Sequence, residues 1–261
     1  MGRKLVSFDF DMTLFDHATW SIPESAEESL RRLKENGHVV VIATGRDMDN
    51  YYSRPYLKLM NADARIEQNG TKVIAGGEVL LDHRMDRELV RRILSFCEER
   101  GYGAGFTVGD DDFYVTPEEV EKRDMKLFGV CGRKFRDPWR ILEMDVRTIL
   151  FIGSDSGGED IREHFPELSL MPFAKEGGAD IVEKEFNKSH GLKLLAEHYG
   201  VDMADTYAFG DSLNDIDMLR AAAVGIAMGN AYPAVKEAAD DITDDIGRDG
   251  VRNALIKYGL I

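Results

Sequence analysis

The feature that most constrains the fold is a short apolar segment near the N-terminus that ends at two acidic residues. Residues 4–8 are strongly apolar and β-prone, and Asp9 and Asp11 follow them directly. Two carboxylates this close repel each other, and proteins tolerate the repulsion mainly where a cation or a reaction uses the charges. Ligands of open α/β sheets bind at the carboxyl ends of the strands. We therefore expect a functional site at the end of this strand; for the motif taken alone, an acidic turn with a helix cap is the alternative.

Strand and helix patterns alternate in the first part of the chain. Residues 23–36 carry apolar side chains at helical spacing, and the continuous apolar run 38–43 is typical of a parallel strand buried on both faces. A second helix is expected over residues 48–60, and Gly76-Gly77 predicts a hairpin turn between two short strands. This alternation predicts an α/β fold with a doubly wound, Rossmann-like parallel sheet.

The pattern changes at about residue 82 and returns near residue 185. Between them we expect an α+β arrangement with these elements: helices over 86–100, from Thr116-Pro117, from Asp137-Pro138 and around Ile161, and strands over 104–108, 113–116, 146–152, 168–171 and 180–183. A helix over 188–199 and strands over 206–209 and 224–228 then resume the first pattern. The simplest organisation is an α/β core of residues 1–81 and 185–261 with an α+β domain, residues 82–184, inserted into it.

Charge and composition exclude several classes of protein. The chain has 48 acidic and 33 basic side chains among 261 residues, a formal charge of −15, which disfavours binding to nucleic acid. No apolar run approaches the roughly 20 residues that span a bilayer, so we expect no membrane association. The two cysteines do not form a disulfide framework, and no signal-peptide pattern precedes the first strand, which together favour the cytoplasm.

Three strands of the predicted core end in polar motifs. These are Asp9/Asp11/Thr13, Thr44-Gly45-Arg46 and the segment 210–215, Gly-Asp-Ser-Leu-Asn-Asp. In a doubly wound sheet these ends can meet in one crevice. Mg²⁺ prefers oxygen ligands and commonly uses one or two carboxylates, so Asp9 and Asp211, with Asp215 nearby, form a candidate metal-binding site.

The same residue types suit phosphoryl transfer. An aspartate can attack phosphorus and form an aspartyl-phosphate, while a second acid protonates the leaving group and later activates water. A threonine and a lysine, here Thr44 and Lys188, can hold the phosphoryl oxygens. The negative charge of the chain makes such a local positive group necessary for any phosphorylated substrate.

These motifs resemble the four motifs of the haloacid dehalogenase-like hydrolase superfamily. Residues 68–70, 225–231 and 249–251 are similar to its Cof-type subfamily, subclass IIB, and so is the position of the insertion. The resemblance covers nearly the whole chain and is specific in the core. In the insertion only the position and the α+β character match.

The resemblance implies a role for each matching residue. Asp9 would be the nucleophile and Asp11 the general acid/base. Metal ligands would be Asp9, Asp11 through its backbone carbonyl, Asp211 and Asp215, the last of which either supports the metal or pairs with Lys188. Phosphate binding is implied for Thr44, Gly45, Lys188 and Asn214.

Two positions depart from the family pattern, and three others have two possible roles. Met12 and Ser189 stand where glycine is usual. Thr13 either caps the next turn or orients the nucleophile loop. Arg46 either forms a structural ion pair or contacts substrate, and Asn230 is either a turn residue or a ligand.

Together these observations predict a Mg²⁺-dependent phosphatase that acts on a small-molecule phosphate ester, most simply a sugar phosphate. Alternatives are a phosphosugar mutase of the same subclass and a non-catalytic protein that binds a phosphorylated metabolite. The inserted domain would act as a cap, with Phe106, Tyr114 and Arg133 as candidates for substrate contact. We expect a monomer or a weak homodimer.

Overall fold

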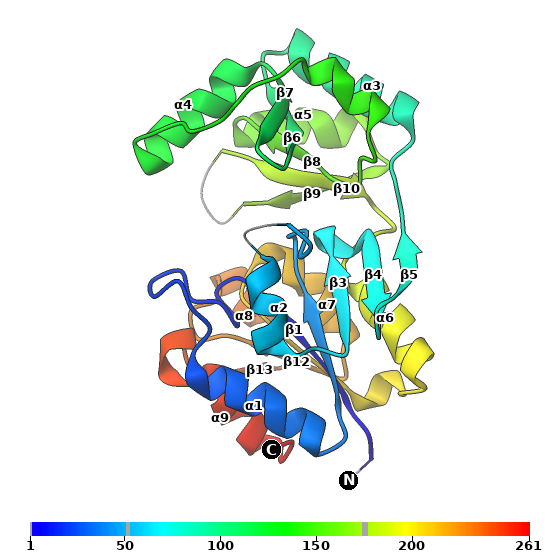
Figure 1. Ribbon diagram of the computed structural model, residues 1–261, viewed down its shortest axis with the longest axis vertical. Coiled ribbons are helices and arrows are strands. Elements are labelled where there is room, and N and C mark those ends of the chain that lie inside the picture. The colour runs from blue at the N-terminus through cyan, green and yellow to red at the C-terminus, as the bar shows by residue number, and fades with distance from the viewer. Residues whose placement is uncertain (1, 51–52, 174–176) are drawn as a thin grey trace. The chain divides into compact units, whose positions relative to one another are not determined.

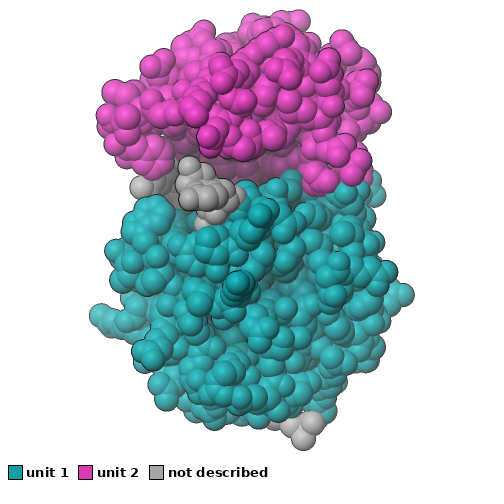
Figure 2. All heavy atoms as spheres, in the orientation of Figure 1, with its two compact units in different colours: residues 1–82, 185–261 teal, residues 83–184 magenta. Residues whose placement is uncertain are grey.

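The computed structural model describes residues 2–50, 53–173 and 177–261. They form two compact units, one of residues 1–82 with 185–261 and the other of residues 83–184 (Figure 2). In the part of the chain that is described, every helix is too short or too polar to cross a membrane.

The first unit is built on an eight-stranded sheet with the order β13-β12-β11-β1-β2-β3-β4-β5 (Figure 1). Its first six strands run parallel, and the hairpin β4–β5 adds two antiparallel strands at one edge. The strands are β1 (Leu5–Asp9), β2 (Val39–Ala43), β3 (Ala64–Glu67), β4 (Lys72–Ala75), β5 (Glu78–Asp82), β11 (Thr206–Gly210), β12 (Val224–Ala227) and β13 (Asp241–Ile242). The hairpin predicted at Gly76-Gly77 is confirmed.

Helices cover both faces of this sheet. One layer contains α1 (Glu24–Glu35), which packs against α2 (Arg54–Met60) and α9 (Gly250–Lys257). The other contains α6 (Lys188–Tyr199), α7 (Ile216–Ala221) and α8 (Pro233–Ala238), in which α7 packs against both of the others (Figure 1). The predicted doubly wound α/β core is therefore confirmed.

The central strand β1 sets the position of the site. All five of its residues are buried, and Phe8 stacks on Phe209 of β11 with 4.8 Å between ring centroids. Chain order reverses at β1, because β2 and β3 lie on one side of it and β11 and β12 on the other. In register, Asp9 is level with Ala43 of β2, and Phe8 is level with Phe209. The polar segments that follow β1, β2 and β11 consequently start at one edge of the sheet.

The second unit is an antiparallel sheet with the order β7-β6-β8-β10-β9 and helices on both faces. Its elements are α3 (Arg87–Glu99), β6 (Gly103–Val108), β7 (Asp111–Val115), α4 (Pro117–Phe128), the 3₁₀ helix η2 (Pro138–Glu143), β8 (Ile149–Ile152), α5 (Asp155–His164), β9 (Leu168–Pro172) and β10 (Ala179–Glu183). Phe106 packs with the α3 side of the sheet, whereas Tyr114 packs with Val120 of α4 on the other side. The two aromatic candidates for substrate contact thus lie on opposite faces.

Two predicted helices differ from the structure. The helix expected over residues 48–60 is too long, since α2 starts at Arg54 and residues 48–50 form turns; residues 51–52 lie outside the described residues. Pro55 explains the late start, because proline lacks an amide hydrogen and is favoured only in the first turn of a helix. The segment from Pro138 forms a 3₁₀ helix rather than an α-helix. The short strand β3 was not predicted.

Candidate active site

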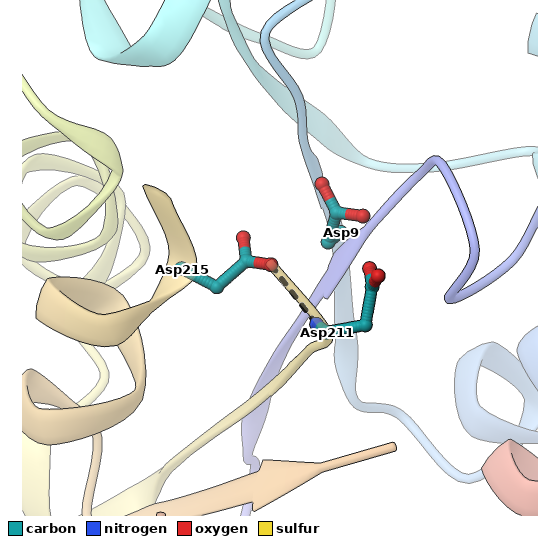
Figure 3. Close-up of side chains that lie close together, drawn as sticks. All are labelled: Asp9, Asp211 and Asp215. Carbon is teal, nitrogen blue, oxygen red and sulfur yellow. Dashed lines mark hydrogen bonds between the residues drawn. The ribbon is translucent and has the colours of Figure 1, made fainter. Parts of the chain in front are cut away.

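Three buried aspartates gather at the carboxyl ends of β1 and β11 (Figure 3). Asp9 is the last residue of β1, Asp211 follows β11, and Asp215 ends the 3₁₀ turn Leu213–Asp215. One carboxylate oxygen of each lies within 4.8 Å of the others. The structure therefore brings together three of the four residues that sequence reasoning assigned to the metal.

Lys188 lies between two of these acids. Its Nζ donates to Oδ1 of Asp9 and to Oδ1 of Asp215, at 2.6 Å each, and its side chain is fully buried. Burial acts to lower the pKa of Lys188, but Asp215 and Asp9 outweigh it and raise that pKa above its usual range. Lys188 thus stays an ammonium ion at the first turn of α6. Of the two roles implied for Asp215, the pairing with Lys188 is observed.

The charge of this cluster is not balanced by protein groups alone. Three carboxylates and one ammonium carry a formal net charge of −2. Burial raises the pKa of Asp9 well above its ordinary value and the pKa of Asp211 to about 7. The negative charge of Asp215 raises both pKa values further. Buried carboxylate oxygens with uncompensated charge are the donor set that a divalent cation such as Mg²⁺ prefers, so the residues fit a metal.

A second acidic group in the same unit provides a contrast. Asp47, Asp49 and Glu67 also lie close together, but Glu67 pairs with Arg65 and Lys72, and Lys72 also pairs with Asp49. Its charge is thus largely compensated by protein cations. This difference favours the cluster around Asp9 as the metal site.

Hydrogen bonds fix the loop that follows β11. Oδ2 of Asp215 accepts from the backbone N–H of Asp211 at 3.0 Å and of Ser212 at 2.9 Å. Oδ1 of Asp211 accepts from the hydroxyl of Thr13 at 3.3 Å, and its Oδ2 accepts from that of Ser212 at 3.2 Å. Thr13 therefore connects the loop after β1 to Asp211, which is closer to an orienting role than to a helix cap.

The start of α6 is held by a close backbone contact. The side chain of Asn187 caps the helix by accepting from the N–H of His190 at 2.9 Å, and the hydroxyl of Ser189 donates to that same amide oxygen at 2.8 Å. Gly70 lies against Asn187, so a Cβ at position 70 would come within 2.2 Å of the Asn187 carbonyl oxygen. Ser189, one of the two departures from the family pattern, thus supports the cap before Lys188.

Thr44 and Asn214 are linked through Asn69, a residue to which the sequence assigned no role. The carbonyl of Thr44 accepts from the N–H of Asn69 at 3.1 Å, and Oδ1 of Asn69 accepts from Nδ2 of Asn214 at 2.9 Å. Thr44 is buried, and its hydroxyl oxygen accepts from the N–H of Arg46 at 3.0 Å. Gly45, which lies between Thr44 and Arg46 in the sequence, is half-buried. Phosphate binding by these residues stays a prediction.

Asp11 is held apart from the three clustered acids. Its carboxylate accepts from Nε of Arg46 at 2.8 Å and Nη2 of Arg46 at 2.5 Å, and it lies 2.6 Å from Nε2 of His17. Burial acts to raise the pKa of Asp11, but the hydrogen bonds from His17 and Arg46 outweigh it and keep that pKa below its usual value. Arg46 therefore forms an ion pair, one of its two predicted roles, and Asp11 is ionised here.

Met12 shows why glycine is usual between these acids. Its φ is +59°, in the left-handed region that residues with a Cβ rarely adopt. The carbonyl of Met12 accepts from Nδ2 of Asn230 at 2.8 Å, and Oδ1 of Asn230 accepts from the N–H of Ile246 at 2.9 Å. Asn230 thus fastens the loop after β1 to a distant part of the chain. The contact supports a structural role for Asn230 rather than that of a ligand.

Replacing Gly70 by alanine should disturb Lys188 through the helix cap. The added Cβ meets the Asn187 backbone, and φ is +102° at this position, so we expect G70A to lower the free energy of unfolding by about 2 kcal/mol. Urea denaturation measures the change. The control is G247A, where a Cβ would meet no atom within 4 Å; an equal loss in G247A would contradict the explanation.

Removing the charge of Lys188 should affect stability as well as activity. K188M leaves two buried carboxylates without their cation, so we expect a loss of about 3 kcal/mol, the range seen when one partner of a buried ion pair is removed. The matched control is K193M on the exposed side of α6, measured in the same metal-free buffer. If both variants unfold at the same urea concentration, the charge balance described above is wrong.

Comparison with known proteins identifies the family. A profile of the haloacid dehalogenase-like hydrolases matches residues 6–255. YkrA of Bacillus subtilis (strain 168), whose phosphatase assignment is provisional, is 31% identical over 100% of both chains. The 5-amino-6-(5-phospho-D-ribitylamino)uracil phosphatase YitU of the same strain is 26% identical over 97% of both.

Solved structures agree with this result. The HAD subclass IIB sugar phosphatase BT4131 is 30% identical, superimposes with a TM-score of 0.86 and is matched over 99% of this chain and 100% of its own. BT1666 of Bacteroides thetaiotaomicron, a phosphatase of the same superfamily, is 25% identical with a TM-score of 0.91, over 99% of this chain and 96% of its own. The chain therefore belongs to the haloacid dehalogenase-like hydrolase family, whose named relatives here are phosphatases.

Proposed function

We propose that this protein is a Mg²⁺-dependent phosphatase that hydrolyses small phosphorylated metabolites through an aspartyl-phosphate on Asp9. The observation that carries the proposal is the pairing of Lys188 with Asp9 inside a buried group of acids. A lysine and a metal together can neutralise the phosphoryl oxygens next to a carboxylate nucleophile, which would otherwise repel them.

The metal would be held by Asp9, Asp211 and Asp215, with the backbone carbonyl of Asp11 as a further ligand. When bound, Mg²⁺ would supply positive charge that neutralises the phosphoryl group and the attacking carboxylate. Thr13 and Ser212 would keep the Asp211 carboxylate in place through the hydrogen bonds described above. Thr44, Gly45, Lys188 and Asn214 would bind the phosphoryl oxygens.

The reaction would proceed in two displacements. A carboxylate oxygen of Asp9 attacks phosphorus, the bond between phosphorus and the leaving oxygen breaks, and Asp11 gives its proton to that oxygen. Asp11 then takes a proton from water, whose oxygen attacks the same phosphorus, and the bond to Asp9 breaks to release phosphate. Because Asp11 is ionised while Arg46 and His17 hold it, it must leave those partners and take up a proton from solvent before it can act as the acid.

A small phosphate ester is the substrate class that the observations favour. One relative is named for a phosphorylated ribitylaminouracil and a structural neighbour as a sugar phosphatase. The formal charge of −15 makes a phosphate polymer a poor ligand. We infer that a sugar phosphate or another phosphorylated metabolite of similar size is hydrolysed, and that residues 83–184 form the cap that selects it.

Changing the nucleophile and the acid should stop the reaction at different points. We expect D9N to reduce kcat at least about 10³-fold, because the amide cannot attack phosphorus. D11N should lose most activity yet accumulate a phosphorylated enzyme, seen by mass spectrometry as the mass of one phosphoryl group on Asp9. Wild-type turnover by D9N would refute the assignment, and isomerised phosphosugar instead of free phosphate would indicate a mutase.

Metal removal should abolish activity and lower stability together. After treatment with EDTA we expect no phosphate release, and added Mg²⁺ should restore activity and raise Tm, because a ligand that binds only the folded state stabilises it. D211N should require at least about tenfold more Mg²⁺ for both effects. D49N, in the compensated acidic group, is the control. An unchanged Mg²⁺ requirement in D211N would exclude Asp211 as a ligand.

A further inference from the structure

Trp20 is the most exposed large apolar side chain among the described residues, with 71% of its surface accessible. It lies in the turn that follows the nucleophile loop, between Asp16 and Ser21. A single exposed apolar side chain is common on protein surfaces. What distinguishes Trp20 is that its turn and its ring contacts fix it next to the loop that carries Asp9 and Asp11.

The turn holds this tryptophan in one place. The N–H of Asp16 donates to the carbonyl of Ser21 at 2.9 Å, and Oδ1 of Asp16 accepts from the N–H of Ala18 at 2.8 Å. The hydroxyls of Thr19 and Ser21 are 2.9 Å apart. Trp20 itself has a φ of +55°, an unfavourable backbone conformation for a bulky residue. Backbone strain of this kind gathers at functional sites, where the surrounding contacts maintain it.

Ring contacts orient the indole and connect it to the proposed active site. Trp20 stacks on His17 with 5.9 Å between centroids and 11° between planes, and it meets Phe15 edge-on at 6.1 Å. Phe15 is buried and stacks on Phe10 of the same loop. Nε2 of His17 is 2.6 Å from the carboxylate of Asp11. The indole is therefore two direct contacts away from the proposed proton donor.

The position of the leaving group follows from the role of Asp11. The oxygen that leaves phosphorus must lie where Asp11 can protonate it, so the rest of the leaving group extends from that side of the phosphate. His17 contacts the carboxylate of Asp11, and Trp20 stacks on His17, so the indole belongs to the surroundings of the group that would protonate the leaving oxygen. An uncharged flat ring is also compatible with so acidic a protein.

We propose that Trp20 is a specificity-determining residue that stacks against a planar heteroaromatic ring carried by the leaving group. The inference rests on the proposed phosphatase function and adds the class of substrate. Indole offers a large flat face for such stacking, and aromatic platforms of this kind hold nucleobases in many binding proteins.

Two substrates that differ only by the ring test this role. Uridine 5′-monophosphate and ribose 5-phosphate share the reacting phosphate and the ribose, but only the first carries a pyrimidine. We expect W20A to lower the ratio of their kcat/KM values, nucleotide over sugar phosphate, by about 5- to 100-fold, and W20F to retain most of it. T19A, which loosens the same turn and keeps the ring, is the control. An equal ratio in W20A and the wild type would overturn the proposal.

A binding measurement separates this proposal from the proposed function. In the double variant D9N/W139F, Trp20 is the remaining tryptophan, and we expect uridine 5′-monophosphate but not ribose 5-phosphate to quench its fluorescence. Selective quenching without hydrolysis by the wild type would support the platform and refute the phosphatase. Hydrolysis of both esters without selective quenching would support the phosphatase and refute the platform. A dimer in the wild type that W20A converts to a monomer would show instead that Trp20 binds a second copy.

Discussion

The buried ion pairs of Lys188 are the interaction on which the rest of the site depends. One ammonium group contacts Asp9 at the end of β1 and Asp215 after β11, and so joins the two central strands to α6. Burial of three carboxylates without a cation is strongly unfavourable, and the lysine compensates only part of their charge. The same arrangement that stabilises the unliganded site therefore leaves it with an affinity for further positive charge.

The core could be predicted from the sequence because its physical signals are local. Continuous apolar runs at β1 and β2, followed directly by polar motifs, indicate buried parallel strands with a site at their ends. The grouping of Asp9, Asp211 and Asp215 followed from that topology together with the family resemblance. The predicted length of α2 was wrong because the apolar residues before Pro55 have helical spacing, whereas the proline restricts where the helix can begin.

Contacts between side chains far apart in the sequence could not be predicted. Nothing local to Asn69 or Asn230 indicates that one connects Thr44 to Asn214 and the other holds the carbonyl of Met12. The contact between Asp11 and His17 was also not predicted, since His17 looks like an ordinary loop residue until the turn brings it to the carboxylate. The left-handed backbone of Met12 has no signal in its residue type, whereas asparagine, the residue at position 69, adopts this conformation more readily than most residues with a Cβ.

The contacts around the loop after β1 have a consequence for how the protein is made. Asp9 depends on Lys188, Thr13 on Asp211 and Met12 on Asn230, pairs separated by 179, 198 and 218 positions in the chain. During synthesis Asp9 leaves the ribosome long before any of these partners exists. A nascent chain that ends before β12 lacks Asn230, so the contacts of this loop are complete only when the C-terminal segment has folded onto the first strand.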